Sequence, residues 1–124
     1  MQILVTAKEN NLESEVDPRF GRCRAFLIVD TETMNFESIS NESAMASGGA
    51  GIQAAQTVAK TGVKIVITGN MGPNAFQTLS AAGIQVFTGA NGTIKEAIEK
   101  YKKGELNKAE APNVGSHSGM GRYQ

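Results

Sequence analysis

The chain has 124 residues, 40% of them hydrophobic, and its 12 Lys and Arg residues balance its 12 Asp and Glu residues. This length fits one domain, and the balanced charge excludes the positive field with which proteins usually attract nucleic acid. The single cysteine rules out an internal disulfide framework, and no apolar run reaches the roughly 20 residues that cross a bilayer, so we expect one soluble cytoplasmic domain with no membrane partner.

Three strand signals occupy the first part of the chain. Residues 3–6 form a short β-branched apolar run and Ala25–Asp30 form a second, so each predicts a buried strand. Residues 34–40 alternate weakly with period two, which leaves their buried face undecided. Because only residues 31–33 separate the last two segments, we predict a hairpin of antiparallel strands.

The second half of the chain alternates helices and strands. Residues 49–60 carry apolar side chains at helical spacing, and Gly62 follows as a residue that can end a helix in the left-handed conformation. A strand over residues 63–67 precedes a second helix, in which Pro73 suits the first turn and Gly83 follows the end.

A last strand and helix complete the pattern. Residues 84–87 predict a strand, and Thr93 and Glu96 have the spacing of a capping box, whose side chains accept hydrogen bonds from amides at a helix start. Residues 62–70 recur in part as residues 83–91. Two successive strand–turn–helix units predict parallel strands joined by right-handed crossovers.

Together these elements predict an α/β fold with three layers, α/β/α, around a mixed five-stranded sheet of order 3-2-1-4-5. That order keeps the hairpin strands adjacent and the connections uncrossed. Open sheets of this kind bind ligands at the carboxyl ends of their strands. From residue 107 the composition turns polar, so we predict a domain over residues 1–106 and a flexible tail over residues 107–124.

The turn formed by Gly69, Asn70, Met71 and Gly72 is the first candidate site. It joins a strand end to a helix start, so its free amides and the positive end of the helix dipole would favour an anion. The same glycines could instead serve only the tight geometry of the turn. The segment lacks the lysine of a P-loop and the spacing of a dinucleotide fingerprint, which argues against ATP or NAD.

Gly48, Gly49 and Gly51 form a second candidate at the start of the first predicted helix. Ser47 is a candidate N-cap, and the glycines exceed what a cap requires. They favour close approach of a ligand, whereas a hinge-like linker between the two halves of the chain is the alternative.

Arg19, Arg22 and Arg24 lie together in one loop before the second strand. Guanidinium groups bind phosphate, carboxylate or an anionic cluster, although a surface salt-bridge network with the upstream carboxylates explains them equally well. Cys23 lies among these cations, which would lower the pKa of its thiol and make it a metal ligand. The alternative is that Cys23 is a plain core residue.

His117 and Met120 lie in the predicted tail, where they could close over a soft metal ion. One histidine and one cysteine cannot assemble a structural zinc site, and no Ser-His-Asp set is evident. We therefore expect no hydrolase or metalloprotease activity.

Five segments share their order and spacing with a known family: VDPRFGR at 16–22, FLIVD at 26–30, GAGIQAA at 49–55, ITGNMGPNAF at 67–76 and KGEL at 103–106. Together they resemble the dinitrogenase iron-molybdenum cofactor biosynthesis family, including its small stand-alone archaeal and bacterial members. The resemblance implies a ribonuclease H-like fold and a protein that carries or inserts an iron-molybdenum cofactor or its cluster precursor, binding it without turnover.

The resemblance also implies which residues bind the cofactor. It falls on Arg19, Gly21 and Arg22, on the Gly48 to Gly51 loop and on the turn at residues 69–72. Many relatives have His before Phe-Gly-Arg, where this chain has Arg19. A guanidinium pairs with an anionic cluster but does not coordinate a metal, so direct ligation passes to Cys23.

Two functions of different classes follow. The first is a non-enzymatic carrier of an anionic iron-sulfur or molybdenum-containing cluster, with Cys23 and His117 as candidate ligands and a cluster-assembly or acceptor protein as partner. The second is a regulatory or interaction domain that binds a small anionic metabolite or a protein. A nuclease is not expected, because the strand ends offer Thr, Gly and Asn instead of clustered carboxylates.

Overall fold

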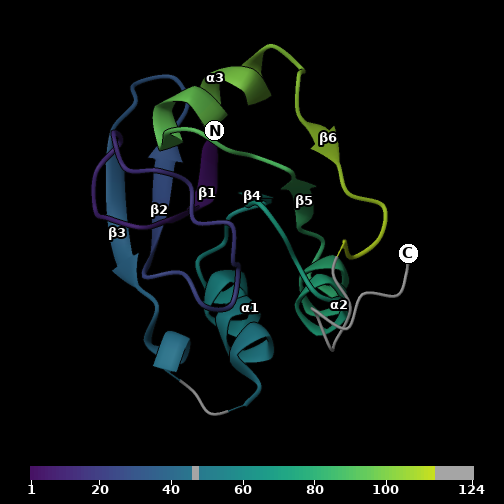
Figure 1. Ribbon diagram of the computed structural model, residues 1–124. Coiled ribbons are helices and arrows are strands. Elements are labelled where there is room, and N and C mark those ends of the chain that lie inside the picture. Colours follow the sequence, from purple (N-terminus) through teal and green to yellow (C-terminus); the bar gives the residue numbers. More distant parts are fainter. Residues whose placement is uncertain (46–47, 114–124) are drawn as a thin grey trace.

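The computed structural model describes residues 1–45 and 48–113, which form a mixed sheet with helices on both faces (Figure 1). The sheet has six strands, which are β1 (Gln2–Ala7), β2 (Ala25–Asp30), β3 (Phe36–Ser40), β4 (Ile65–Ile67), β5 (Gln85–Thr88) and β6 (Asn107–Lys108). The helices are the short 3-10 helix η1 (Glu42–Met45) and the α-helices α1 (Ala50–Lys60), α2 (Pro73–Ala81) and α3 (Ile94–Lys102).

The strand order is β3-β2-β1-β4-β5-β6. β1 and β2 pair antiparallel, as do β2 and β3, whereas β1, β4 and β5 run parallel. The predicted order 3-2-1-4-5 is confirmed, and the predicted number of five strands is wrong. The sixth strand contains only two exposed polar residues, whose pairing with β5 depends on the backbone, so no hydrophobic period announces it.

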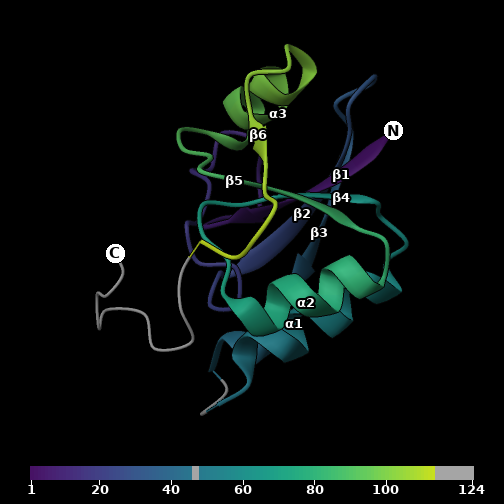
Figure 2. The same cartoon turned by 90° about the vertical axis from the view of Figure 1, so that its right-hand side faces the viewer.

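The three predicted layers are present. Figure 2 shows α1 and α2 together on one face of the sheet and α3 on the other. Alternate residues of β1 enter different cores: Leu4 packs with side chains of α1 and α2, while Ile3 and Val5 pack with those of α3. Each such buried aliphatic side chain contributes roughly 1.5 to 3 kcal/mol. The ribonuclease H-like assignment stays a prediction.

Residues 107–113 belong to the segment that the sequence predicted as a tail. They include β6, and Ala109 N donates a hydrogen bond to Val86 O at 2.7 Å. The predicted metal ligand His117 lies outside the described residues, as does Met120. None of the helices within the described ranges has the length and apolar character that crossing a membrane requires.

The carboxyl ends of β1 and β4 meet in the middle of the sheet. The side-chain oxygens of Thr6 and Thr68 lie 2.8 Å apart, and Thr6 Oγ1 also donates to Asp17 O at 2.6 Å. Asp17 N donates in turn to Thr6 O. These bonds fix the loop that follows Asp17 at the strand ends, where the sheet topology predicts a ligand site.

Candidate functional site

A cavity of about 510 Å³ opens at this edge of the sheet. Three stretches of chain that are distant in sequence form its walls: the loop before β2, the start of α1 and the turn leading into α2. The lining residues are Pro18, Arg19, Phe20, Gly21, Arg22, Gly49, Ala50, Gly51, Ile52, Asn70, Gly72, Pro73, Asn74 and Ala75.

The helix α1 begins at the cavity without a side-chain cap. Its N-cap residue is Gly49, with a left-handed φ of 71° that glycine adopts without strain, and the predicted cap Ser47 lies outside the described residues. Gln53 N donates to Gly49 O, but the amides of Ala50, Gly51 and Ile52 have no acceptor in the described parts of the chain. These amides line the cavity at the positive end of the helix dipole.

The helix α2 begins at the same cavity and also lacks a side-chain cap. Gly72 is its N-cap residue, and Pro73, which has no N–H, occupies its first turn. The amides of Asn74 and Ala75 have no acceptor among the residues that the structure describes. Two helix starts therefore direct unpaired donors at one cavity.

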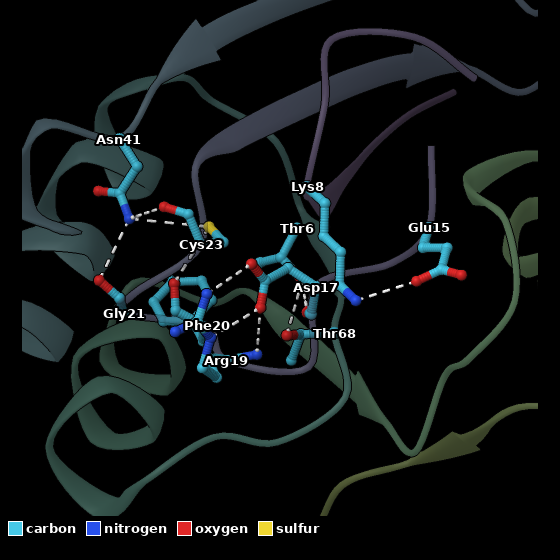
Figure 3. Close-up of polar contacts among 10 residues, drawn as sticks. All are labelled: Thr6, Lys8, Glu15, Asp17, Arg19, Phe20, Gly21, Cys23, Asn41 and Thr68. Atoms are coloured by element: carbon cyan, nitrogen blue, oxygen red, sulfur yellow. Dashed lines mark hydrogen bonds and ion pairs between the residues drawn. The ribbon is translucent and has the colours of Figure 1, made fainter. Parts of the chain in front are cut away.

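Arg19 is fixed at the edge of the cavity by Asp17 (Figure 3). One carboxylate oxygen of the buried Asp17 accepts hydrogen bonds from Arg19 N at 2.9 Å and Arg19 Nε at 3.1 Å, and the other accepts from Nη2 at 3.2 Å. The hydrogen bond and charge of Asp17 raise the pKa of Arg19, whose side chain is 65% exposed. The guanidinium therefore stays charged and accessible.

Arg22 also lines the cavity, and its Nη1 donates to Ala44 O of η1 at 2.8 Å. Arg24 lies in the same loop but does not line the cavity. Arg19 and Arg22 thus place two cations beside the two uncapped helix starts, and this arrangement favours an anion.

Two of the predicted glycines allow segments of backbone to touch. A Cβ on Gly69 would lie 2.6 Å from Pro18 Cα, and a Cβ on Gly21 would lie 2.9 Å from Gly51 N. Asn70 N donates to Pro18 O at 2.8 Å across the first of these contacts. The two glycines therefore close the walls of the cavity, because any larger residue would force the walls apart.

Cys23 is fully buried and does not line the cavity. Its Sγ donates to Phe20 O at 3.4 Å, and Asn41 Nδ2 lies 3.7 Å from the sulfur (Figure 3). Burial, with a smaller contribution from the charge of Asp17, raises the pKa of Cys23 to about 12. The expected lowering of its pKa is wrong, because the nearby arginine side chains turn outward and desolvation of the thiolate dominates.

Comparison with known proteins identifies the family. The family model described as dinitrogenase iron-molybdenum cofactor matches residues 1–104. The chain belongs to this dinitrogenase iron-molybdenum cofactor family. An uncharacterized protein of Methanocaldococcus jannaschii is 34% identical over 113 residues, which cover 89% of this chain and 92% of that protein.

Two solved structures share the fold of this chain. The apo form of the orange protein from Desulfovibrio gigas has a TM-score of 0.87 and 44% identity, covering 90% of this chain and 95% of the other. A NifB-like protein from Thermotoga has a TM-score of 0.74 and 37% identity, covering 86% of this chain and 91% of the other.

The predicted site residues that the structure describes, a set without His117, fall into three groups. Those that line the cavity are Arg19, Gly21, Arg22, Gly49, Gly51, Asn70 and Gly72. Gly48 is exposed outside the lining, whereas Gly69, Met71 and Cys23 are buried and do not line the cavity. The cavity therefore joins the three predicted loops but not the predicted thiol ligand.

Sequence reasoning did not assign roles at the site to Asp17 or Asn113. Asp17 positions the Arg19 side chain, and Asn113 contacts the turn at residues 69–71. The role of Asp17 could have been predicted from the sequence, because an Asp side chain often accepts a hydrogen bond from the backbone two residues ahead, here that of Arg19. Asn113 had no comparable signal, because its partners lie more than forty residues away.

Proposed function

We propose that this chain is a non-enzymatic carrier that holds an anionic metal-sulfur cluster, containing iron or molybdenum, in the cavity at the carboxyl ends of β1 and β4. The observation that carries the proposal is the convergence of two uncapped helix starts and two arginines on one space. Unpaired amides, helix dipoles and guanidinium groups all stabilise negative charge. Membership of the iron-molybdenum cofactor family supports this choice of anion.

The lining supports binding by charge and hydrogen bonds instead of coordination. Among the described residues, it contains no thiol, imidazole or carboxylate, and no group of three or more His, Cys, Asp or Glu residues could hold a metal ion. The volume of about 510 Å³ lies within the range of about 300 to 1,000 Å³ that small-ligand sites occupy. Sulfide or oxo groups on the surface of a cluster would accept the hydrogen bonds.

The same lining supports a carrier over an enzyme. General acid–base and nucleophilic catalysis depend on titratable side chains, and the described lining offers two arginines instead.

Ile52 lies at the cavity with 37% of its surface exposed. We place the contact with a cluster-assembly or acceptor protein at this apolar side chain.

An anaerobic titration tests the proposal. The probe is tetrathiomolybdate, an anion that carries molybdenum and sulfide and absorbs visible light, followed by gel filtration and metal analysis. We expect retained colour, and because each bond to a charged group contributes about 1.5 to 3 kcal/mol, Arg22→Ala should weaken binding by roughly tenfold or more.

Two control variants make the titration specific. Arg24→Ala removes a cation from the same loop but outside the lining, so it should bind the probe as the wild type does. Cys23→Ser should also retain the colour, because the buried thiol does not line the cavity. A wild-type chain that elutes without metal after exposure to tetrathiomolybdate, or to iron, sulfide and molybdate together, would refute the carrier.

The absence of metal-ligating side chains from the described lining also favours a second candidate, a regulatory domain that binds a small anionic metabolite. The same amides and arginines would then hold a phosphoryl or carboxylate group. Competition separates the candidates: if inorganic phosphate or citrate binds and displaces tetrathiomolybdate at equal concentration, the metabolite function replaces the carrier.

A further inference from the structure

Asn113 makes four hydrogen bonds to the turn between β4 and α2. Its backbone N donates to Met71 O at 3.1 Å, and its Oδ1 accepts from Met71 N at 2.7 Å. Its Nδ2 donates to Gly69 O at 3.3 Å and to Asn70 Oδ1 at 3.2 Å. One side chain thus contacts three consecutive residues of a turn that forms part of the cavity wall.

The C-terminal strap, residues 107–113, brings Asn113 to this turn. The strap begins with β6 beside β5, and Ala109 packs against the core beneath α1 and α2. In Figure 2 the strap runs from β6 along the molecule toward α2. The position of Asn113 is therefore set by the sheet and the core, not by Asn113 alone.

The bond from Asn113 determines which end of the Asn70 amide is free. Asn70 lines the cavity, and its Oδ1 is occupied by Asn113 Nδ2. Its own Nδ2 has no acceptor in the part of the chain that the structure describes. The group that Asn70 has available for a ligand is consequently a donor, which suits an anion, whereas a rotated amide would offer an oxygen that repels one.

The bonds to Met71 hold the turn itself in place. Met71 is 1% exposed, and an unpaired buried amide costs about 1 to 3 kcal/mol, so the Oδ1 of Asn113 replaces a partner that the turn lacks. Gly72, the N-cap residue of α2, follows directly. Movement of the turn would displace both Asn70 and the uncapped start of α2.

We propose that Asn113 is a positioning residue of the anion site, which holds the turn at residues 69–71 and orients the Asn70 amide so that its nitrogen donates to the bound anion. This inference rests on the proposed function for the identity of the ligand. It adds the C-terminal strap to the site and assigns the strap an effect on the affinity for anions.

A double-mutant cycle tests the proposal with tetrathiomolybdate as the probe. Loss of the hydrogen bond from Asn70 to a charged ligand predicts that Asn113→Ala and Asn70→Ala each weaken binding by roughly tenfold or more. Because Asn113 orients the Asn70 amide, the two effects should overlap, and the double variant should show an effect well below the product of the two single effects. Asn107→Ala is the matched control, since it makes the same change in the same strap at a side chain without a hydrogen bond in the described chain, and it should bind as the wild type does.

A second measurement is independent of the ligand. Hydrogen exchange of the Met71 amide should be slow in the wild type and in Asn107→Ala, and at least tenfold faster in Asn113→Ala, because its acceptor has gone. Unchanged exchange in Asn113→Ala overturns the proposal, as does wild-type affinity in Asn113→Ala or multiplication of the two single effects. If the wild type does not bind tetrathiomolybdate while Met71 exchange responds as expected, the proposed function fails and the placement of the turn by Asn113 stands.

Discussion

The start of α3 and the starts of α1 and α2 meet the same physical requirement in opposite ways. At α3, Thr93 Oγ1 accepts from Glu96 N and Glu96 Oε1 accepts from Thr93 N, while the amides of Ile94 and Lys95 donate to carbonyls of the loop at residues 12–14. At α1 and α2 the cap residues are glycines, and the first-turn amides have no acceptor within the described ranges.

The difference shows at which helix starts the described chain leaves hydrogen-bond donors for an outside acceptor. Orphan amides at a helix start need an acceptor from a side chain, from another part of the chain, from water or from a ligand. At α3, away from the cavity, the chain supplies an acceptor for each first-turn amide, whereas the described residues supply none for the amides of Ala50 to Ile52 or of Asn74 and Ala75. Four predictions test this contrast and the cavity wall between the two helix starts, from the largest expected effect to the smallest.

Reversing the cavity charge should have the largest effect. Arg19→Glu combined with Arg22→Glu places two anions beside the uncapped starts, so we expect tetrathiomolybdate affinity to fall by at least about a hundredfold. Calorimetric titration measures the loss. Arg24→Glu is the control from the same loop, and an equal loss there would show that only overall charge matters.

Separating the walls of the cavity should destabilise the fold. A methyl group on Gly69 would meet the backbone of Pro18, so Gly69→Ala should lower the free energy of unfolding by about 2 to 3 kcal/mol. Chemical denaturation measures this cost. Gly48→Ala, where a Cβ meets open space, should change stability by less than about 0.5 kcal/mol. Equal stability of the two variants would contradict the contact between the loops.

High pH tests whether the cations of the cavity influence the thiol behind its wall. Burial raises the pKa of Cys23 to about 12 in the folded protein, whereas the pKa of a cysteine thiol in an unfolded chain is about 8.5. Below about pH 8.5 the thiol is protonated in both states, and its contribution to the free energy of unfolding is fully present. As pH rises from about 8.5 toward about 12, the unfolded state loses this proton first, so the free energy of unfolding should fall by at most about 1.4 kcal/mol per pH unit.

Urea unfolding at several pH values between 8 and 11 checks this slope, with Cys23→Ser as the variant that should lack it. Identical slopes in both proteins would place the titration elsewhere. A thiol that reacts rapidly with a disulfide reagent at pH 8 in the folded protein would show that the arginines dominate after all.

The smallest effects are expected from adding a side-chain cap at α2 and removing the one at α3. Gly72 has φ −82° and ψ 175°, which suits a capping serine, so Gly72→Ser should stabilise the protein by about 0.3 kcal/mol while weakening anion binding. Thr93→Ala removes the cap of α3, so it should lower stability by about 1 kcal/mol and leave anion affinity unchanged. Thermal melts measure the stability of both variants, and titrations measure their anion affinity. If stability and affinity changed together in both variants, the starts of α2 and α3 would not differ as described.

The sequence predicted the parts of the fold that carry a periodic or capping signal. The buried runs of β1 and β2, the apolar stripes of the helices and the Thr93–Glu96 box all indicated their elements, and uncrossed connections then ordered five strands. β6 was not predicted, because its pairing with β5 depends on the backbone alone. The three loops of the candidate site were predicted for the same topological reason, since strand ends gather at one edge.

The roles of single residues at the site were harder to predict. Neighbours in sequence made Cys23 look cationic, but the direction in which Arg19 and Arg22 turn is a three-dimensional property, and burial controls the thiol. Gly69 looked like a ligand-binding glycine, although its contact is Pro18 from a distant loop. Composition and spacing do not report such contacts.

Under the proposed carrier function, the bond between Pro18 and Asn70 determines when the protein could take up a cluster. It joins the loop before β2 to the turn after β4, so the cavity exists only once β4 has paired with β1. A nascent or partly unfolded chain would hold no cargo, and cargo at a hundred times its dissociation constant would raise the free energy of unfolding by about 2.7 kcal/mol. Loading would thereby select complete molecules, and the loaded protein would resist proteolysis better than the empty one.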